Sequence, residues 1–340
     1  MTEPTRKMKY VRLGASGLKV SKIILGCMSY GTPEWQGWVL PEEESLEHIK
    51  RAYDLGINTF DTANVYSNGV SETILGKAIK KHNLPRQEIV VLTKVYFAVK
   101  KTHKEPLLNA GAYINQQGLS RKHIFDSVKA SLERLQLDYI DVLQCHRFDY
   151  DTPIEETMQA LHDVVKAGYV RYIGMSSCWA WQFHAMQNYA INNKLTPFVS
   201  MQNLYNLLYR EEEREMLPTL KHFGVGCIPW SPLARGNLSR PDANERTTRQ
   251  DTDNYQSAYD NCPKEIKLRV QELAEKKGVS MSQIALAWVL LNDTITAPII
   301  GVTKIKNLED LAEAIHVEIT PEEKAYLEEK YEARENYGFV

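Results

Sequence analysis

The chain has few of the features that mark membrane proteins, disulfide-rich proteins or zinc ribbons. No apolar run approaches the ~18 residues of a membrane span. Its five cysteines form no C-x-x-C pair, and an odd count in a chain of 340 residues argues against a disulfide framework. The first residues lack the apolar core of a secretory signal. We therefore expect reduced thiols and a cytoplasmic location.

An excess of charge of either sign is also missing. The chain has 41 Lys and Arg residues against 43 Asp and Glu residues, a formal net charge of −2. This balance argues against a nucleic-acid binder, which carries a basic excess. Hydrophobic residues make up 43% of the chain, enough for a core, so disorder is excluded as the dominant state. We expect a small-molecule partner rather than nucleic acid or membrane, and the sequence gives no sign of the oligomeric state.

Short apolar segments alternate with long amphipathic ones. The predicted strands cover residues 23–26, 59–61, 89–93, 139–143, 172–175, 198–202, 226–229 and 297–300. The predicted helices cover residues 42–55, 71–80, 120–135, 152–167, 181–193, 211–223, 264–277 and 281–291. Such alternation indicates a parallel sheet with helical crossovers, and eight units favour a closed (β/α)8 TIM barrel. We predict a single α/β domain with its core at about residues 8–330.

An open doubly wound sheet is the alternative fold. It would normally show a G-x-G-x-x-G turn after an early strand, which this chain lacks. We interpret residues 14–17 as the turn of a hairpin, 10–13 with 18–21, at the bottom of the barrel. The aperiodic stretches 100–119 and 236–262 would be long loops on the C-terminal face, or disordered surface inserts.

Titratable residues follow three consecutive predicted strands. Asp61 ends the second strand and Tyr66 comes five positions later, Lys94 follows the third strand, and His146 follows the fourth. Each alone has an ordinary structural explanation, but the carboxyl ends of barrel strands meet at one mouth. We therefore expect the four side chains to form one site.

These four residue types suit the protonation of an oxygen. A lysine ammonium favours the phenolate and lowers the pKa of a tyrosine, ordinarily ~10. Asp61 would hold Lys94 charged, and His146 would bond a substrate oxygen or share a proton with Tyr66. This suits carbonyl reduction by a hydride, which a cofactor must supply. A metal site is the competing use of Asp and His, but no H-E-x-x-H occurs and we predict none.

The later strand ends carry residues suited to a dinucleotide. Serine hydroxyls and side-chain amides can bind a carboxamide, an indole can stack on a flat ring, and barrels often bind phosphate after strands seven and eight. The candidates are Ser176, Ser177, Gln202, Asn203, Trp230, Ser231, Pro232, Leu233, Arg235, Gly236, Arg240, Gly301, Thr303, Lys304 and Asn307. Lys304 and Arg240 would meet an extra 2′-phosphate, which favours NADP, although a solvated cationic turn explains Lys304 as well.

Taken in order, these motifs resemble the aldo-keto reductase family. The matching segments are 56–63 with Tyr66, 71–76, 93–94, 144–147, 166–177, 202–203, 230–233 and 301–304. The sequence around His146 and Trp230 is similar to that of a fungal-type branch of the family, which includes aryl-alcohol dehydrogenases and versiconal hemiacetal acetate reductases.

The resemblance implies a barrel that binds NADPH across its C-terminal face, with Tyr66 as general acid completed by Asp61, Lys94 and His146. It also implies Ser176, Gln202 and Asn203 around the carboxamide and Trp230 on the ring. Asp310 fits an acidic position that bonds the adenine. Many relatives have Gln and Asn where this chain has Asn307 and Leu311, so its adenosine contacts differ.

Two functional hypotheses follow. The first is an NADPH-dependent aldehyde or ketone reductase with an aromatic pocket, which suits aryl or alkyl carbonyl compounds. Its candidate lining residues are Tyr30, Trp35, Trp38, Tyr96, Phe97, Phe148 and Trp179, each of which ordinary packing would also explain. The second is a cofactor-sensing regulatory subunit, resembling potassium-channel β subunits.

Overall fold

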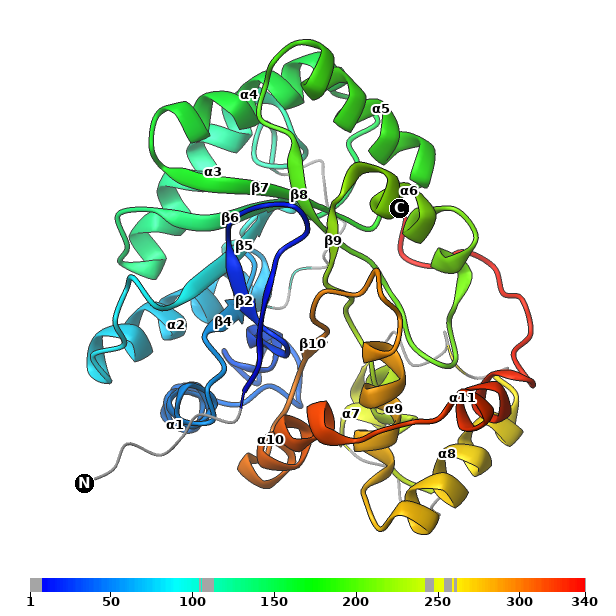
Figure 1. The fold of residues 1–340 in the computed structure, drawn as a ribbon. Coiled ribbons are helices and arrows are strands. Elements are labelled where there is room, and N and C mark those ends of the chain that lie inside the picture. Colours follow the sequence, from blue (N-terminus) through cyan, green and yellow to red (C-terminus); the bar gives the residue numbers. More distant parts are fainter. Residues whose placement is uncertain are drawn as a thin grey trace.

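In the computed structural model, eight parallel strands form the centre of the molecule and helices surround them (Figure 1). The structure describes residues 8–103, 105, 113–241, 248–253, 259 and 262–339. The strands, in spatial order, are β10 (Ile299–Ile300), β3 (Ile24–Gly26), β4 (Thr59–Asp61), β5 (Val90–Val95), β6 (Ile140–Cys145), β7 (Val170–Ser176), β8 (Phe198–Gln202) and β9 (Gly226–Cys227). The Ile299 amide donates to the Pro229 carbonyl at 2.9 Å, which joins the first and last strands of this order. The predicted barrel is confirmed.

Helices lie around the outside of the barrel, most of them between successive strands (Figure 1). They are α1 (Glu42–Asp54), α2 (Val70–Lys81), α3 (Arg121–Leu135), α4 (Ile154–Lys166), α5 (Ala180–Asn192), α6 (Met216–Phe223), α7 (Thr248–Thr252), α8 (Lys264–Lys277), α9 (Met281–Leu290), α10 (Ile305–Ala312) and α11 (Pro321–Glu328). Ser120 caps α3 as its position predicts, because its Oγ accepts a hydrogen bond from the His123 amide at 3.2 Å. Within the described residues, no helix combines the length and apolarity that crossing a membrane requires.

The predicted helix at 211–223 is wrong at its start. Residues Glu211–Glu213 form a separate 3-10 turn, and α6 begins only at Met216. Pro218 explains the break, because a proline lacks an amide proton and is tolerated in the first turn of a helix but not in its interior. A helix starting at 211 would place Pro218 in its interior.

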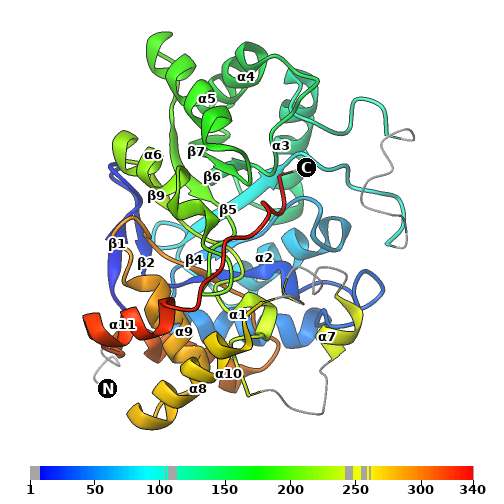
Figure 2. The same cartoon turned by 90° about the vertical axis from the view of Figure 1, so that its right-hand side faces the viewer.

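A hairpin closes one end of the barrel. β1 (Tyr10–Arg12) pairs antiparallel with β2 (Lys19–Ser21), as predicted. Leu13 and Val20 are fully buried and pack with Ile24, Val90 and other residues near the starts of the barrel strands. Figure 2 shows the hairpin and α7 on opposite sides of the molecule. The other end of the barrel therefore remains for the site.

The two aperiodic stretches are described only in part. Residues 104, 106–112, 242–247, 254–258, 260 and 261 lie outside the described residues. In the second stretch, residues 248–252 form helix α7, which the sequence did not predict.

Candidate active site

The four predicted catalytic residues come together at the C-terminal ends of β4, β5 and β6. Asp61 is the last residue of β4, Lys94 lies in β5, and His146 directly follows β6. Tyr66 opens the short turn after β4. Asp61, Lys94 and His146 are buried, while Tyr66 is half-buried. Neighbouring parallel strands therefore deliver these side chains to one edge of the barrel, as the sequence predicts.

Lys94 is the centre of the group. Its Nζ donates to Asp61 Oδ2 at 2.6 Å, to the Thr62 carbonyl at 2.9 Å and to the Tyr66 hydroxyl at 3.2 Å. The ammonium thus uses three donors on three acceptors, which offsets its complete burial. Burial works against the charge, but Asp61 and Tyr66 outweigh it and raise the pKa of Lys94. Lys94 is therefore cationic throughout the neutral range.

The pKa of Tyr66 differs from the sequence-based expectation. Burial raises it above its ordinary value, although the charge and hydrogen bond of Lys94 act in the opposite direction. The expected net lowering was wrong, because the sequence showed the neighbouring cation but not the depth of the phenol. Tyr66 therefore keeps its proton at neutral pH, which is the form that a proton donor requires.

His146 is neutral and has an unused nitrogen. Burial, with smaller effects of Arg147 and Lys94, lowers the pKa of His146 well below its usual value. Its ring meets the Tyr66 ring edge-on, with the centroids 5.8 Å apart. Its Nδ1 is buried without a hydrogen-bond partner among the described residues. A neutral imidazole here is suited to bonding a ligand oxygen rather than to supplying the reaction's proton.

Two glutamine side chains bond the second carboxylate oxygen of Asp61 and so extend the hydrogen-bond network of Lys94. Gln144 and Gln202 each donate from Nε2 to Asp61 Oδ1 at 2.9 Å, and Gln202 also donates to Gln144 Oε1. Sequence reasoning did not assign Gln144 a role. Its signal was the two-residue spacing from His146, which places both side chains on the same face of a strand.

The turn that carries Tyr66 has a strained backbone. Ser67, Asn68 and Gly69 have φ of 47°, 49° and 91°, in the left-handed region. Ser67 Oγ accepts from the Thr32 amide at 3.2 Å, and a Cβ on Gly31 would lie 2.0 Å from that oxygen. Only glycine fits at position 31, so the loop after β3 holds the turn that places Tyr66.

The candidate cofactor residues after β7, β8 and β9 form a connected group. Ser176 Oγ donates to the Gln202 carbonyl at 2.7 Å, and the Trp230 indole donates to Ser177 Oγ at 3.2 Å. Asn203 Oδ1 accepts from the Ser177 amide at 2.8 Å. Trp230 is half-buried, so its indole nitrogen is fixed while part of its surface stays open.

The loop after Trp230 has a kinked backbone. Ser231, Ala234, Arg235 and Gly236 all have positive φ. Pro232 is buried, whereas Ser231, Leu233 and Arg240 are half-buried. Such kinked loops turn backbone amides toward anions, which fits the predicted phosphate contact.

An ion-paired cluster ties this loop to α7 and to the loop after β3. Asp253 Oδ2 accepts from Arg235 at 2.5 Å and from Arg249 at 3.1 Å. The Arg249 guanidinium lies 4.2 Å from the centre of the Trp38 ring. Arg235, Asp253 and Arg249, which we call the rim tie, therefore link the loop after Trp230 to α7, and Arg249 extends this contact to Trp38 in the loop after β3.

The segment after β10 leads into α10. Lys304 is the N-cap of that helix, with Gly301 and Thr303 just before it and Asn307 in its first turn. Asp310 lies later in α10, where its Oδ2 accepts from Ser280 Oγ at 2.6 Å, and its contact with the adenine stays a prediction. The structure therefore gives Asp310 a partner in the protein, at the start of α9.

The predicted aromatic pocket residues fall into three groups. Trp35 and Phe97 flank the site, with ring centroids 6.2 Å from Tyr66 and 5.2 Å from His146, and Tyr96 packs on Phe97. Phe148 lies beside Trp181, and Trp179 packs on Phe339 of the C-terminal segment. Tyr30 is fully buried and lines no open surface, and Trp38 is covered by Arg249.

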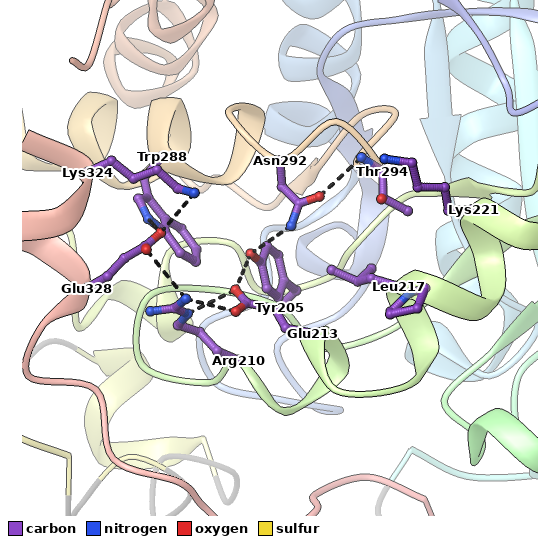
Figure 3. A pocket seen from close by; sticks show the side chains of 11 residues that line it. Tyr205, Arg210, Glu213, Leu217, Lys221, Trp288, Asn292, Thr294, Lys324 and Glu328 are labelled. Atoms are coloured by element: carbon purple, nitrogen blue, oxygen red, sulfur yellow. Dashed lines mark hydrogen bonds and ion pairs between the residues drawn. The ribbon is translucent and has the colours of Figure 1, made fainter. Parts of the chain in front are cut away.

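A separate cavity of about 310 Å³ lies away from these residues, beside α6, α9 and α11 (Figure 3). Its charged groups are ion-paired, and among them Lys221 pairs with Asp293 outside the lining. Arg210 pairs with Glu213 at 2.8 Å, and the Trp288 indole donates to Glu328 at 2.8 Å. Tyr205 donates to Glu213 at 2.7 Å. These contacts give the cluster a structural role.

Comparison with known proteins identifies the family of the chain. The model of the aldo/keto reductase family matches residues 22–332. The chain belongs to the aldo/keto reductase family. It is 53% identical to versiconal hemiacetal acetate reductase of Aspergillus parasiticus over 335 residues, covering 95% of this chain and 97% of that protein. It is 48% identical to an aldo-keto reductase of Metarhizium robertsii, covering 96% of this chain and 91% of that protein. A Schizosaccharomyces pombe protein that carries the name aryl-alcohol dehydrogenase is 51% identical, covering 95% of each chain.

The chain is accordingly an oxidoreductase of a family that reduces carbonyl groups and generally uses nicotinamide cofactors.

Proposed function

We propose that the protein reduces aldehydes or ketones to alcohols, with NADPH as the hydride donor and Tyr66 as the general acid. The observation that carries this proposal is the position of Lys94 Nζ, bonded at once to Asp61 and to the Tyr66 hydroxyl in a buried site. The cation stabilises the phenolate that remains when Tyr66 gives up its proton.

The chain's donors fit a nicotinamide dinucleotide. Trp230 offers a fixed, partly open ring, and the loop from Ser231 to Gly236 offers kinked backbone. Lys304 and Arg240 supply positive charge for a 2′-phosphate, which supports NADPH over NADH. When bound, this cofactor supplies a hydride to the carbonyl carbon.

The protein's own residues handle the oxygen. His146 and the Tyr66 hydroxyl approach it together, and the Tyr66 proton moves to the oxygen as negative charge develops there. Lys94 then balances the phenolate, and Asp61 holds Lys94 in place. Trp35 and Phe97 beside these groups favour an aryl or apolar carbonyl substrate.

The test is the variant Tyr66→Phe, which removes one hydroxyl and keeps the ring. We expect NADPH binding close to that of the wild type and turnover with an aromatic aldehyde lowered by about 10²-fold or more, the scale of a general acid. Binding is measured by fluorescence titration and turnover by loss of NADPH absorbance. Unchanged turnover would exclude Tyr66 as the acid.

A further inference from the structure

Glu212 is a buried carboxyl group behind the strand ends that carry the nicotinamide candidates. It lies in the 3-10 turn Glu211–Glu213 after β8, with 4% of its surface exposed. Its Oε2 accepts a hydrogen bond from Asn203 Nδ2 at 2.5 Å. We propose that Glu212 is a positioning residue for the nicotinamide subsite, because it orients the Asn203 side-chain amide, which bonds Ser177, the partner of the Trp230 indole. This inference rests on the proposed use of a nicotinamide cofactor.

The orientation of Asn203 depends on an acceptor at position 212. Asn203 Oδ1 accepts from the Ser177 amide at 2.8 Å, so its Nδ2 must point the other way, toward Glu212. A flipped amide would place two N–H donors face to face at Ser177, and at ionised Glu212 it would place two acceptors face to face. Glu212 therefore selects the rotamer that Ser177 needs.

Asn203 connects three strand ends in one ring of hydrogen bonds. Its side chain accepts from Ser177, which follows β7, and its carbonyl accepts from the Trp230 amide at 2.9 Å. The Trp230 indole closes the ring on Ser177 Oγ. Ser177 has φ of 46°, a left-handed conformation that a serine keeps only when its surroundings enforce it. The Ser177 amide also donates to the Gln202 carbonyl at 3.2 Å. Reorienting the Asn203 side chain would therefore leave Ser177 on this longer bond and loosen the Trp230 indole through Ser177.

The acceptor oxygen matters more than the charge. Burial raises the pKa of Glu212 to about 8, although the Asn203 hydrogen bond opposes the rise. The protonated and ionised forms each keep an oxygen that can accept from Asn203. An apolar side chain would fill the space at a smaller desolvation cost if packing were the only task. Glutamine at position 212 should therefore keep the orientation of Asn203, and leucine should lose it.

The experiment compares Glu212→Leu and Glu212→Gln with the wild type. We expect the dissociation constant for NADPH, from fluorescence titration, to rise about tenfold in Glu212→Leu and to change less than about twofold in Glu212→Gln. The control is Asp141→Asn, which alters a buried carboxylate bonded to Arg86 and the Val91 amide, near the start of β6. It should lower the unfolding temperature without changing NADPH affinity.

Amide hydrogen exchange without cofactor gives a readout that does not depend on the proposed function. The amide of Ser177, which the Asn203 side chain bonds, should exchange at least about tenfold faster in Glu212→Leu and at the wild-type rate in Glu212→Gln. If the wild type fails to bind NADPH, the proposed function falls, and exchange alone decides the role of Glu212.

If Glu212→Leu bound NADPH and exchanged the Ser177 amide as the wild type does, the inference would be overturned. It would also be overturned if Glu212→Gln lost as much NADPH affinity as Glu212→Leu. If Glu212→Leu does not fold, the double variant Asn203→Leu with Glu212→Leu is measured instead. It removes both polar groups together, so the Asn203 Nδ2 donor is not left buried without an acceptor, and it should destabilise the fold less. It should bind NADPH about tenfold more weakly, and wild-type binding would again overturn the inference.

Discussion

The two sides of the barrel mouth are built differently. The catalytic side, at β4 to β6, holds Lys94 by three hydrogen bonds to the neighbouring β4 end and the turn after it, and its polar atoms are deeply buried. The candidate cofactor side, at β7 to β10, combines left-handed backbone in the loop from Ser231 to Gly236 with the ion pairs of the rim tie. Groups that transfer a proton benefit from rigid strand ends, whereas a cofactor that enters and leaves needs segments that open.

Removing the central cation should have the largest effect. In Lys94→Met, Asp61 loses its ionic partner and the Tyr66 phenolate loses its stabilising charge. We expect turnover to fall by roughly 10³-fold or more and the free energy of unfolding to fall by about 3–5 kcal/mol, the cost of breaking a buried ion pair. Steady-state kinetics and denaturant unfolding measure the two effects.

The matched control is Lys22→Met. Lys22 is a partly buried lysine that donates to the Ile295 and Thr296 carbonyls near the opposite end of the barrel. Turnover in this variant should stay within about twofold of the wild type. An equal loss in both variants would mean that burial of a lysine, rather than its place beside Tyr66, is what matters.

Loosening the rim tie should change cofactor release more than chemistry. Asp253→Asn leaves Arg235 and Arg249 beside each other without their shared carboxylate. We expect NADPH to dissociate about tenfold faster in a stopped-flow displacement experiment, while single-turnover reduction stays near the wild-type rate. Asp293→Asn, at an exposed ion pair with Lys221, is the control and should alter neither rate. Slower single turnover with unchanged release would contradict the assignment.

The pH profile should show little change across the neutral range. In the proposed reaction Tyr66 acts in its protonated form. Its pKa is raised, so reduction should be lost only as pH rises above the ordinary tyrosine value of about 10. His146 has a lowered pKa, so it stays neutral and adds no acidic limb near pH 6.5. The measurement is kcat/KM for the aldehyde from pH 6 to 10, in overlapping buffers. A loss of activity between pH 7 and 8 would contradict this description of Tyr66.

The smallest effect on the site is expected from a helix cap. Ser120→Ala removes the Oγ that accepts from the His123 amide at the start of α3. The free energy of unfolding should fall by about 1 kcal/mol with turnover unchanged, because the cap stabilises the scaffold only. Denaturant unfolding measures this loss, and a change in turnover would show that α3 reaches the site.

The sequence predicted the barrel and the convergence of Asp61, Tyr66, Lys94 and His146 because strand alternation fixes where strand ends meet. It did not predict the burial of the Tyr66 phenol, so the expected shift of the Tyr66 pKa had the wrong direction. It also placed Glu212 inside a predicted helix at 211–223, although Pro218 prevents a helix that begins at residue 211. Tyr30 is an aromatic residue near a strand end, and sequence alone does not say whether such a ring points inward or toward the rim.

The most direct test of the central claim is stoichiometric. Purified protein is mixed with limiting NADPH and a panel of aromatic and aliphatic aldehydes, and both NADPH absorbance and the alcohol product are measured. We expect one alcohol to form for each NADPH consumed, with aromatic aldehydes reacting best. Tight NADPH binding without consumption by any member of the panel would contradict it and would favour a cofactor-sensing role.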